Sequence, residues 1–573
     1  MLQALTTPRG ETLSGTPWQV YPRPQMRRDS YINLNGEWDF AVSSGKPETF
    51  DMRITVPFCP ESRLSGIGRH FEEGAPLWYR RRFLLPEGFR RERVLLHIGA
   101  ADQIAEVFVN GQHLCRHEGG YASFCVDITE ALAEENELVI RCTDDLHDQA
   151  FPYGKQVMNR GGMWYTPVSG IWQTVWLESV PGTYIENLNI ENHGASVTIS
   201  TVPPLDGTVS VEQLGQFPLE HGQVTIAPEN PHFWCPDDPY LYRFTVETAQ
   251  DKVESYFAIR SLEIKKVGEH PRLCLNGKPY FFHGLLDQGY WPEGLLTAPA
   301  PESYADDILA MKRLGFNTLR KHIKVEPEEF YYQCDRLGMI VWQDMVNNGS
   351  YRYFRDTVLP TVGIQKRNDR RLHSDERSRN TFRQGAADAV NQLKNHPCIC
   401  YWTIFNEGWG QFDSDRVCGW FRTLDATRFI DTTSGWFRGK NTDVDSRHQY
   451  FGKLRLEGDG LRPLVLSEFG GKTWRVEGHI FNPDKTYGYG ACPTREALNE
   501  AVAALYQESI VPAVEKGLCA AIYTQVSDVE DEVNGLITYD RRVVKLDADT
   551  MLPISRALQD AMEKTVASFE KMG

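Results

Sequence analysis

The chain has 573 residues, and 61 Lys and Arg residues stand against 77 Asp and Glu residues, which gives a formal net charge of −16. At roughly 100–200 residues per domain this length predicts three or four domains, and the 41% of hydrophobic residues argue against a disordered chain. The acidic balance argues against a nucleic-acid partner, whose phosphates need a basic face. No apolar run approaches the roughly 18–20 residues of a membrane span, and the N-terminus shows no secretory signal pattern. We therefore expect a cytoplasmic protein with no membrane partner.

Residues 1–180 have the pattern of an all-β domain. The runs Val94–Ile98 and Ala105–Val109 are rich in β-branched and aromatic residues, and the second ends at Asn110-Gly111, a strong hairpin signal. Tryptophans lie in or beside further short runs, which fits either a sandwich core or a platform for carbohydrate. We expect most of them in the core: Trp38, Trp78, Trp164, Trp172 and Trp176.

Residues 181–265 have the pattern of a second, smaller β domain. Pro181-Gly182 marks the change, and turn signals at Pro203-Pro204, Asp206-Gly207 and Asn230-Pro231 separate short apolar runs. The length fits a small immunoglobulin-like sandwich. Nothing in this segment suggests chemistry, so we interpret it as a spacer.

Residues 266–573 alternate between strand and helix patterns. Ile308, Met311 and Leu314 share the face of a predicted helix that Gly315 ends. Short apolar runs typical of buried parallel strands occupy 317–320, 339–344, 398–405, 429–432, 464–467 and 519–524. No glycine-rich βα turn favours a doubly wound sheet. We therefore predict a C-terminal (β/α)8 TIM barrel.

The twelve cysteines give no indication of a metal site. Only Cys398 and Cys400 lie close together, inside an apolar run, and a structural zinc site needs a second ligand pair. We expect buried, unreactive thiols, no metal and no cofactor.

Two predicted barrel strands end in a glutamate. The run Tyr401–Phe405 leads into Asn406-Glu407, and the run Pro463–Ser467 leads into Glu468. The carboxyl ends of barrel strands surround the active site of such folds. A carboxyl pair there suits glycoside hydrolysis, in which one group protonates the leaving oxygen and the other attacks the anomeric carbon. The alternative is a pair of strand-end salt bridges with arginines.

At these positions the sequence resembles glycoside hydrolase family 2, which contains β-galactosidases, β-glucuronidases and β-mannosidases. Thr403–Trp409 (TIFNEGW) resembles the family's acid/base segment, and Leu466–Gly470 (LSEFG) its nucleophile segment. Other segments resemble, in order, the family's jelly-roll domain, sandwich and barrel entry: Tyr31–Trp38, Ser169–Leu177, Trp234–Tyr242 and Asn276–Pro279. The resemblance covers essentially the whole chain. It implies a jelly-roll sugar-binding domain, an immunoglobulin-like β-sandwich and a catalytic barrel.

The resemblance also implies residue roles. Glu407 is expected to be the general acid and then the general base, and Glu468 the nucleophile of a retaining exo-β-glycosidase. The resemblance assigns Asn406 to the sugar 2-hydroxyl, Tyr450 to the nucleophile carboxylate and Arg320 to the same carboxylate. Further expected substrate contacts, each with a structural alternative, are His322, Asp344, Trp436 and Asn534.

The sequence leaves open which sugar is cleaved, a neutral hexose or a uronic acid. The family's β-glucuronidases carry an Asn-x-Lys pair whose lysine meets the sugar carboxylate, and here Glu532 and Asn534 occupy those positions. A glutamate would repel a uronate, which favours a neutral hexose and a β-galactosidase-like activity. The alternative is a β-uronidase, a glucuronidase or galacturonidase, that holds the carboxylate through Arg320, Lys321 or Arg438. A carbohydrate-binding protein without catalysis is a third hypothesis.

Two long loops, 345–375 and 470–492, follow predicted strands. We expect them either to shape the substrate pocket over the barrel or to form a contact of a homo-oligomer.

Overall fold

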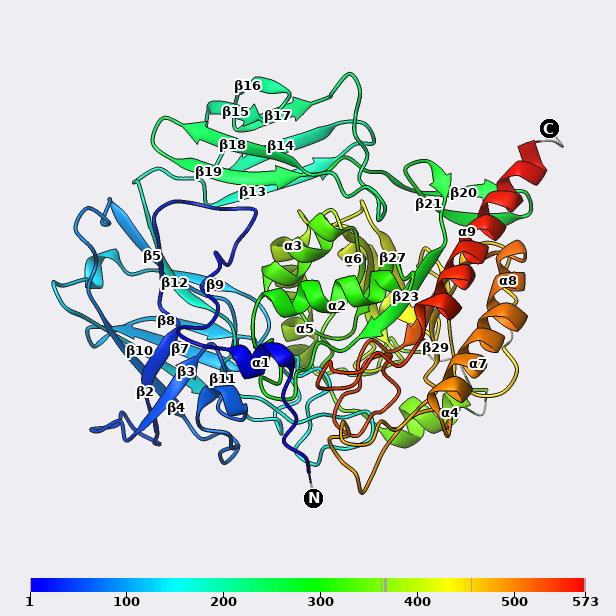
Figure 1. Cartoon of the computed structure of the whole chain (residues 1–573). Coiled ribbons are helices and arrows are strands. Elements are labelled where there is room, and N and C mark those ends of the chain that lie inside the picture. Colours follow the sequence, from blue (N-terminus) through cyan, green and yellow to red (C-terminus); the bar gives the residue numbers. More distant parts are fainter. Residues whose placement is uncertain (1, 362, 365–367, 455, 571–573) are drawn as a thin grey trace.

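The computed structural model describes residues 2–361, 363–364, 368–454 and 456–570. Figure 1 shows three parts: a β domain at the lower left, a smaller β domain at the top, and a barrel with its helices on the right. The two strand-rich segments and the segment of alternating strands and helices correspond to these three parts, so the predicted fold class is confirmed.

The first β domain consists of two antiparallel sheets that face each other. One sheet has the order β1 (Tyr31–Asn33), β12 (Val175–Val180), β5 (Arg93–Ile98) and β9 (Phe124–Asp127). The other has the order β3 (Met52–Val56), β2 (Gly36–Val42), β4 (Leu77–Phe83), β10 (Asn136–Thr143), β7 (Ile104–Val109) and β8 (Gln112–Glu118). The short strands β6 (Ala101–Asp102) and β11 (Gly170–Ile171) form a separate pair.

Alternating apolar residues of these strands form the core between the sheets. Trp38, Phe40 and Tyr79 are fully buried there. The predicted hairpin joins β7 to β8 at Asn110-Gly111, where both residues have positive φ, as the tight turn requires. A short helix, α1 (Pro8–Thr12), precedes the domain.

The second β domain is a sandwich of a three-stranded and a four-stranded antiparallel sheet. The first has the order β13 (Asn187–Asn192), β14 (Val197–Val202) and β17 (Gln223–Ile226). The second has the order β16 (Gly215–Leu219), β15 (Gly207–Val211), β18 (Tyr242–Thr248) and β19 (Lys252–Phe257). The boundaries 180/181 and 265/266 stay predictions; the strands on either side of the first are β12 and β13.

Eight parallel strands form the barrel. Their order is β27 (Phe429–Ser434), β26 (Ile399–Asn406), β25 (Ile340–Asp344), β24 (Thr318–Lys321), β23 (Phe282–Asp287), β30 (Leu518–Thr524), β29 (Leu464–Gly470) and β28 (Asp445–Gln449). Between the first and last strands of this order, the Ser434 and Ser446 hydroxyls lie 3.4 Å apart, so the sheet closes on itself. A small sheet, β20 (Leu262–Val267), β21 (His270–Leu275) and β22 (Lys278–Pro279), leads into it.

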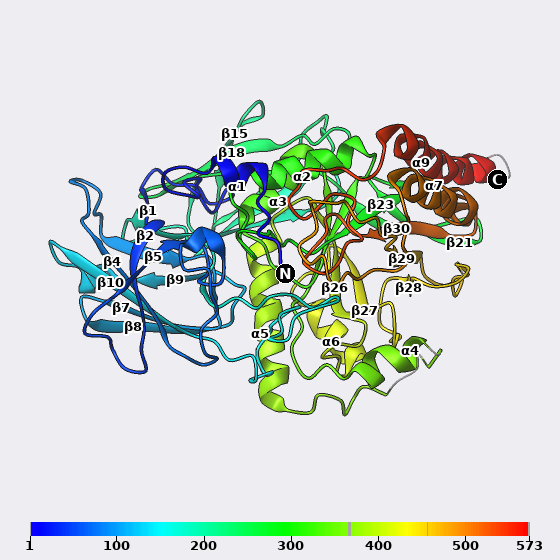
Figure 2. The ribbon, with the colours of Figure 1, turned by 60° about the horizontal axis from the view of Figure 1, so that its bottom comes forward.

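Helices cover the outside of the barrel (Figure 2). They are α2 (Glu302–Arg313), α3 (Glu328–Leu337), α4 (Leu359–Thr361), α5 (Glu376–Leu393), α6 (Ser414–Phe421), α7 (Arg495–Leu505), α8 (Val511–Glu515) and α9 (Ala548–Glu570). The predicted helix with Ile308 and Met311 on its buried face is α2, and Gly315, with φ of 86°, follows its end. Within the described residues, no helix is both long and apolar enough to cross a bilayer.

Candidate active site

The two predicted catalytic glutamates lie together at the carboxyl ends of the barrel strands. Glu407 directly follows β26, and Glu468 lies in β29. Both are buried. One carboxylate oxygen of each and Nδ1 of His448 all lie within 4.8 Å of one another. This separation fits the roughly 5–5.5 Å of a retaining glycosidase and not the roughly 6.5–9.5 Å of an inverting one.

Glu468 has the surroundings of an ionised carboxylate. Arg320 Nη1 donates to Oε1 at 3.0 Å, and the Tyr450 hydroxyl donates to Oε2 at 2.6 Å. Burial alone would raise the pKa of Glu468, but the positive charges of His448 and Arg320 lower it to about 2. This carboxylate is therefore charged and available as a nucleophile at neutral pH.

The pKa of Glu407 is shifted in the opposite direction. Burial and the nearby charge of Glu468 raise its pKa above the ordinary range, and the hydrogen bond of 2.8 Å between Oε1 and His448 Nδ1 opposes that shift. Two neighbouring carboxyl groups whose pKa values are driven apart form the usual arrangement of a general acid beside a nucleophile.

Arg320 connects Glu468 to two other predicted site residues. Its Nη2 donates to Asn406 Oδ1 at 2.8 Å, and its Nε donates to Asp344 Oδ1 at 3.0 Å. Asn406 Nδ2 is buried without a hydrogen-bond partner among the described residues. A buried amide donor without a protein acceptor is suited to a substrate hydroxyl.

His322 follows β24 and is fixed by Asp344, whose Oδ2 lies 2.7 Å from its Nδ1. Burial lowers the pKa of His322 to about 4, against the raising effect of the Asp344 hydrogen bond. The ring is therefore neutral at pH 7. Because Nδ1–H donates its hydrogen bond to the Asp344 carboxylate, Nε2 is left as an acceptor.

The remaining predicted residues lie around this group in different ways. Trp436 is half-buried, with its ring centroid 6.2 Å from that of His448. Asn534 is fully buried, accepts from Gln525 Nε2 at 3.0 Å and lies 3.4 Å from a Glu532 oxygen. Asn534 is therefore engaged by its own loop.

Glu532 is less free than the sequence alone indicates. Its Oε2 accepts a hydrogen bond from the Tyr165 hydroxyl, and its Oε1 accepts from Asn534 Nδ2. Both carboxylate oxygens thus have protein donors. These neutral donors fix the orientation of the carboxylate but do not remove its charge, so the expectation that Glu532 repels a uronate stays a prediction.

The loop 470–492 borders the site. Tyr489 stacks on Tyr450 with ring centroids 3.9 Å apart. The backbone of Tyr487 forms a parallel β-bridge with that of Glu532. This position supports the expectation that the loop shapes the pocket. Part of the other loop, at 362 and 365–367, lies outside the described residues.

Two residues of the site did not emerge from the sequence. His448 lies between both glutamates, and Lys155 comes from the first β domain. His448 belongs to β28, whose sequence DSRHQ lacks the apolar run that marked the other strands. Lys155 lies in a loop with no catalytic motif. The only recognisable pattern near it is the turn-like sequence Pro152-Tyr153-Gly154.

Two groups of His, Asp and Glu side chains are compact enough for a metal ion within the described part of the chain: Glu407 with His448 and Glu468, and Glu73 with Asp145 and His147. The first group already has the Arg320 guanidinium as the counter-charge of Glu468. The second is partly exposed, and His147 pairs there with both acids. The expectation of no metal stays a prediction.

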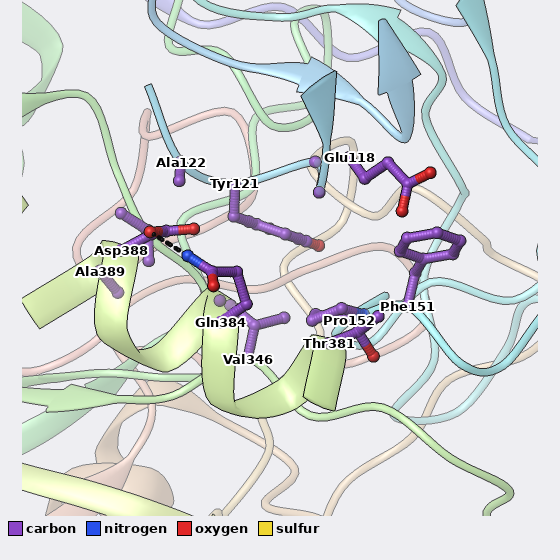
Figure 3. Close-up of a pocket in the computed structure, with 14 residues that line it drawn as sticks. Glu118, Tyr121, Ala122, Phe151, Pro152, Val346, Thr381, Gln384, Asp388 and Ala389 are labelled. Atoms are coloured by element: carbon purple, nitrogen blue, oxygen red, sulfur yellow. Dashed lines mark hydrogen bonds between the residues drawn. The ribbon is translucent and has the colours of Figure 1, made fainter. Parts of the chain in front are cut away.

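An apolar hollow of about 100 Å³ lies away from the glutamates, between the first β domain and α5. Figure 3 shows Tyr121 and Phe151 on one side and Gln384, hydrogen-bonded to Asp388 at 2.8 Å, on the other. Its two acidic residues, Glu118 and Asp388, come from opposite sides, and Asp388 is engaged by Gln384. We interpret it as imperfect packing between domains.

The fold and site together define a multidomain (β/α)8-barrel protein with two accessory β domains and a buried carboxylate pair at the barrel's carboxyl end. Three family models match the chain in order: "Glycosyl hydrolase 2 galactose-binding domain-like" at 69–160, "Glycosyl hydrolases family 2" at 183–260 and "Glycosyl hydrolases family 2, TIM barrel domain" at 266–456. The chain belongs to glycoside hydrolase family 2.

The curated relatives share about a quarter of the aligned residues with this chain. A β-galactosidase of Thermoanaerobacter pseudethanolicus is 24% identical over 57% of this chain and 44% of its own length. A β-glucuronidase of Bacteroides fragilis is 23% identical over 66% of this chain and 56% of its own. The matched region thus spans about half the length of these two relatives.

Solved structures share the fold over almost the whole chain. A β-glucuronidase from an uncultured Clostridium sp. has a TM-score of 0.71 at 18% identity and covers 95% of this chain and 100% of its own. A β-galacturonidase from Eisenbergiella tayi has a TM-score of 0.66 at 17% identity, covering 95% and 98%. At this identity the likeness concerns the fold.

Proposed function

We propose that the protein is a retaining exo-β-glycosidase that releases a terminal β-linked uronic acid, glucuronic or galacturonic. The observation that carries the glycosidase part is the pair Glu407 and Glu468, close together with opposite pKa shifts. The uronic acid is supported by the relatives and solved structures, most of which are named β-glucuronidases or β-galacturonidases.

The proposed reaction has two steps. Glu468 attacks the anomeric carbon while Glu407 donates its proton to the leaving oxygen, which forms a covalent glycosyl-enzyme and releases the alcohol. Glu407, now ionised, takes a proton from water, whose oxygen displaces Glu468 and releases the sugar with its original anomeric configuration. The unpaired Asn406 amide is suited to the 2-hydroxyl in both steps.

A neutral β-hexosidase, β-galactosidase-like, is the second candidate. It is favoured by Glu532, which stands where the family's β-glucuronidases carry the carboxylate-binding lysine, and by the β-galactosidase relative. The two candidates differ only in the group at C6 of the sugar, so a matched set of substrates separates them.

The test is hydrolysis of p-nitrophenyl β-D-glucuronide, galacturonide, glucoside, galactoside, mannoside and fucoside. We expect a uronide to be the best substrate, and NMR of the first product to show the β-anomer. A neutral sugar as the best substrate would favour the second candidate. No release from folded protein on any substrate would contradict both.

The carboxylate roles have their own test. Glu468→Gln should abolish turnover, and Glu407→Gln should lower it by about 10²–10⁴-fold because general acid catalysis is worth that much. Glu477→Gln, on the exposed side of loop 470–492, is the matched control and should leave the rate unchanged. Full activity in either catalytic variant would overturn the assignment.

A further inference from the structure

Lys155 is a buried cation without an anionic partner. Lys155 is only 7% exposed. Within the described part of the chain, its ammonium makes neither an ion pair nor a hydrogen bond. The other buried Lys and Arg head groups of that part all have hydrogen-bond partners: Arg28, Arg260, Arg272, Arg320, Lys321, Lys324, Arg428 and Lys545. The Lys155 Nζ itself keeps a small accessible surface, so a ligand can reach the ammonium.

The ammonium of Lys155 lies beside the catalytic group. It is 5.8 Å from the ring centroid of Trp409, two residues after the general acid, and 5.5 Å from that of Tyr165. Its charge lowers the pKa of both Glu407 and His322. Cation–π contacts of this kind stabilise the ammonium only partly.

The segment that carries Lys155 is fixed on the barrel. Asn347, just after β25, accepts hydrogen bonds through its carbonyl from the backbone of Tyr153 and Gly154, and the Lys155 carbonyl accepts from the Tyr165 backbone. Gly154 has a φ of 67°, which favours glycine, and a Cβ there would lie 2.9 Å from the Tyr121 hydroxyl and 3.1 Å from the Ile323 carbonyl. The first β domain thereby presents this lysine at the mouth of the barrel.

The other cations considered for a uronate are already paired. Arg320 binds Glu468 and Asp344, and Lys321 binds Asp287 at 2.6 Å and Glu326 at 2.9 Å. Arg438 binds Asp445 at 2.6 Å. The charge of each of these cations is thus already balanced by a protein carboxylate, whereas that of Lys155 is not.

We propose that Lys155 binds the C6 carboxylate of the β-uronoside and is the specificity-determining residue of this enzyme, in place of the lysine that Glu532 replaces. This inference rests on the proposed uronidase function. A charge-assisted hydrogen bond between ammonium and carboxylate, shielded by Trp409 and Tyr165, would neutralise two charges in the closed complex. A neutral hexose leaves the ammonium unpaired, so the same contact discriminates against it.

A different role for Lys155 is to adjust the general acid alone. In that case its removal would raise the pKa of Glu407 and change the alkaline side of the pH–rate profile equally for every sugar. A carboxylate contact changes mainly the KM of uronides. The two roles are therefore separable by comparing sugars that differ only at C6.

The test is Lys155→Met, which preserves the length and apolar stem of the side chain. For wild type and variant, kcat and KM are measured on p-nitrophenyl β-glucuronide and galacturonide and on the matched glucoside and galactoside. We expect kcat/KM for the uronide to fall by about 10²-fold, mainly through KM, and that for the neutral partner to change by less than about threefold. Lys155→Arg should recover part of the loss.

Lys252→Met is the matched control, because Lys252 is an exposed lysine at the start of β19 in the second β domain. It should leave all values unchanged. Binding of free glucuronate and galacturonate, followed as a rise in the unfolding temperature, gives a second readout that does not depend on turnover. We expect the rise in wild type and in Glu468→Gln, and its loss in Lys155→Met.

Equal losses on uronide and neutral sugar, or no loss on either, would overturn the role of Lys155 while leaving the uronidase function standing. A wild-type enzyme that prefers neutral sugars would instead overturn the proposed function itself. If Lys155→Met does not fold, Lys155→Gln is measured in the same way, and an unchanged KM for the uronide would overturn the inference.

Discussion

At the scale of single residues, the site depends on one histidine that contacts both carboxyl groups. His448 Nδ1 lies 2.8 Å from Glu407 and 3.6 Å from Glu468, and Nε2 lies 3.1 Å from the Ser434 hydroxyl. The charge of His448 lowers the pKa of both glutamates. The histidine therefore sets the pH range in which one carboxyl is protonated while the other is ionised.

His448→Asn should move the whole pH–rate profile to higher pH. Without the imidazole, the pKa of Glu468 rises and shifts the acid limb upward, and the pKa of Glu407 rises and shifts the alkaline limb upward. The measurement is kcat/KM against pH on the best substrate. His193→Asn, on an exposed turn of the second β domain, is the control. A profile that loses height without moving would contradict this role.

The sequence predicted the residues at this scale that stand in motifs. Glu407, Glu468, Asn406 and Arg320 occur at strand ends with recognisable neighbours. In the structure Arg320 donates to both Glu468 and Asn406, and carboxylate oxygens of Glu407 and Glu468 lie within 4.8 Å of each other. Lys155 could not be found in this way, because the hydrogen bonds that fix its segment on the barrel join Tyr153 and Gly154 to Asn347, far away in the sequence, and no local pattern encodes them.

At the scale of elements, prediction succeeded where one pattern decided the structure. The apolar runs at 398–405 and 464–467 became β26 and β29, because a strand buried on both faces needs apolar residues throughout. β28 did not follow this rule: Asp445 is buried, and it pairs with Arg438 and Arg447. Polar residues in that strand are stabilised by ion pairs, which periodicity does not reveal.

Asp335 in α3 holds three elements together. Its carboxylate accepts from the Tyr256 hydroxyl of β19 at 2.7 Å, from the Cys398 amide at 2.8 Å, and lies 2.7 Å from His396 Nδ1. Removing it leaves these buried groups without partners, which costs about 1–3 kcal/mol for each neutral group.

Asp335→Ala should therefore lower the unfolding temperature by several degrees, with KM unchanged because the residue is remote from the catalytic group. Asp306→Ala, whose carboxylate makes an exposed pair with Arg9, is the control and should change the unfolding temperature little. Circular dichroism during heating measures both. An Asp335→Ala variant as stable as the control would show that the interface relaxes around the loss.

At the scale of the whole molecule, a buried ion network joins the two β domains. Arg28 pairs with Glu178 on β12 at 3.1 Å and with Asp251, in the turn before β19, at 2.8 Å. His97 on β5 stacks on Trp176 and lies 3.5 Å from Glu178. Because the first β domain also supplies Lys155 to the barrel, the stability of this interface bears on the active site.

Because of this network, we expect the free energy of unfolding to fall as the pH rises. Burial alone would lower the pKa of His97, but the charge of Glu178 raises it to about 9. A histidine with a raised pKa in the folded state stabilises it fully below the unfolded value of about 6.5 and loses that effect as the pH rises through 9. We expect the unfolding temperature to fall by a few degrees between pH 6.5 and 9.5. His97→Gln should be less stable at pH 6.5 and nearly insensitive to this change, and equal slopes for both proteins would contradict the assignment.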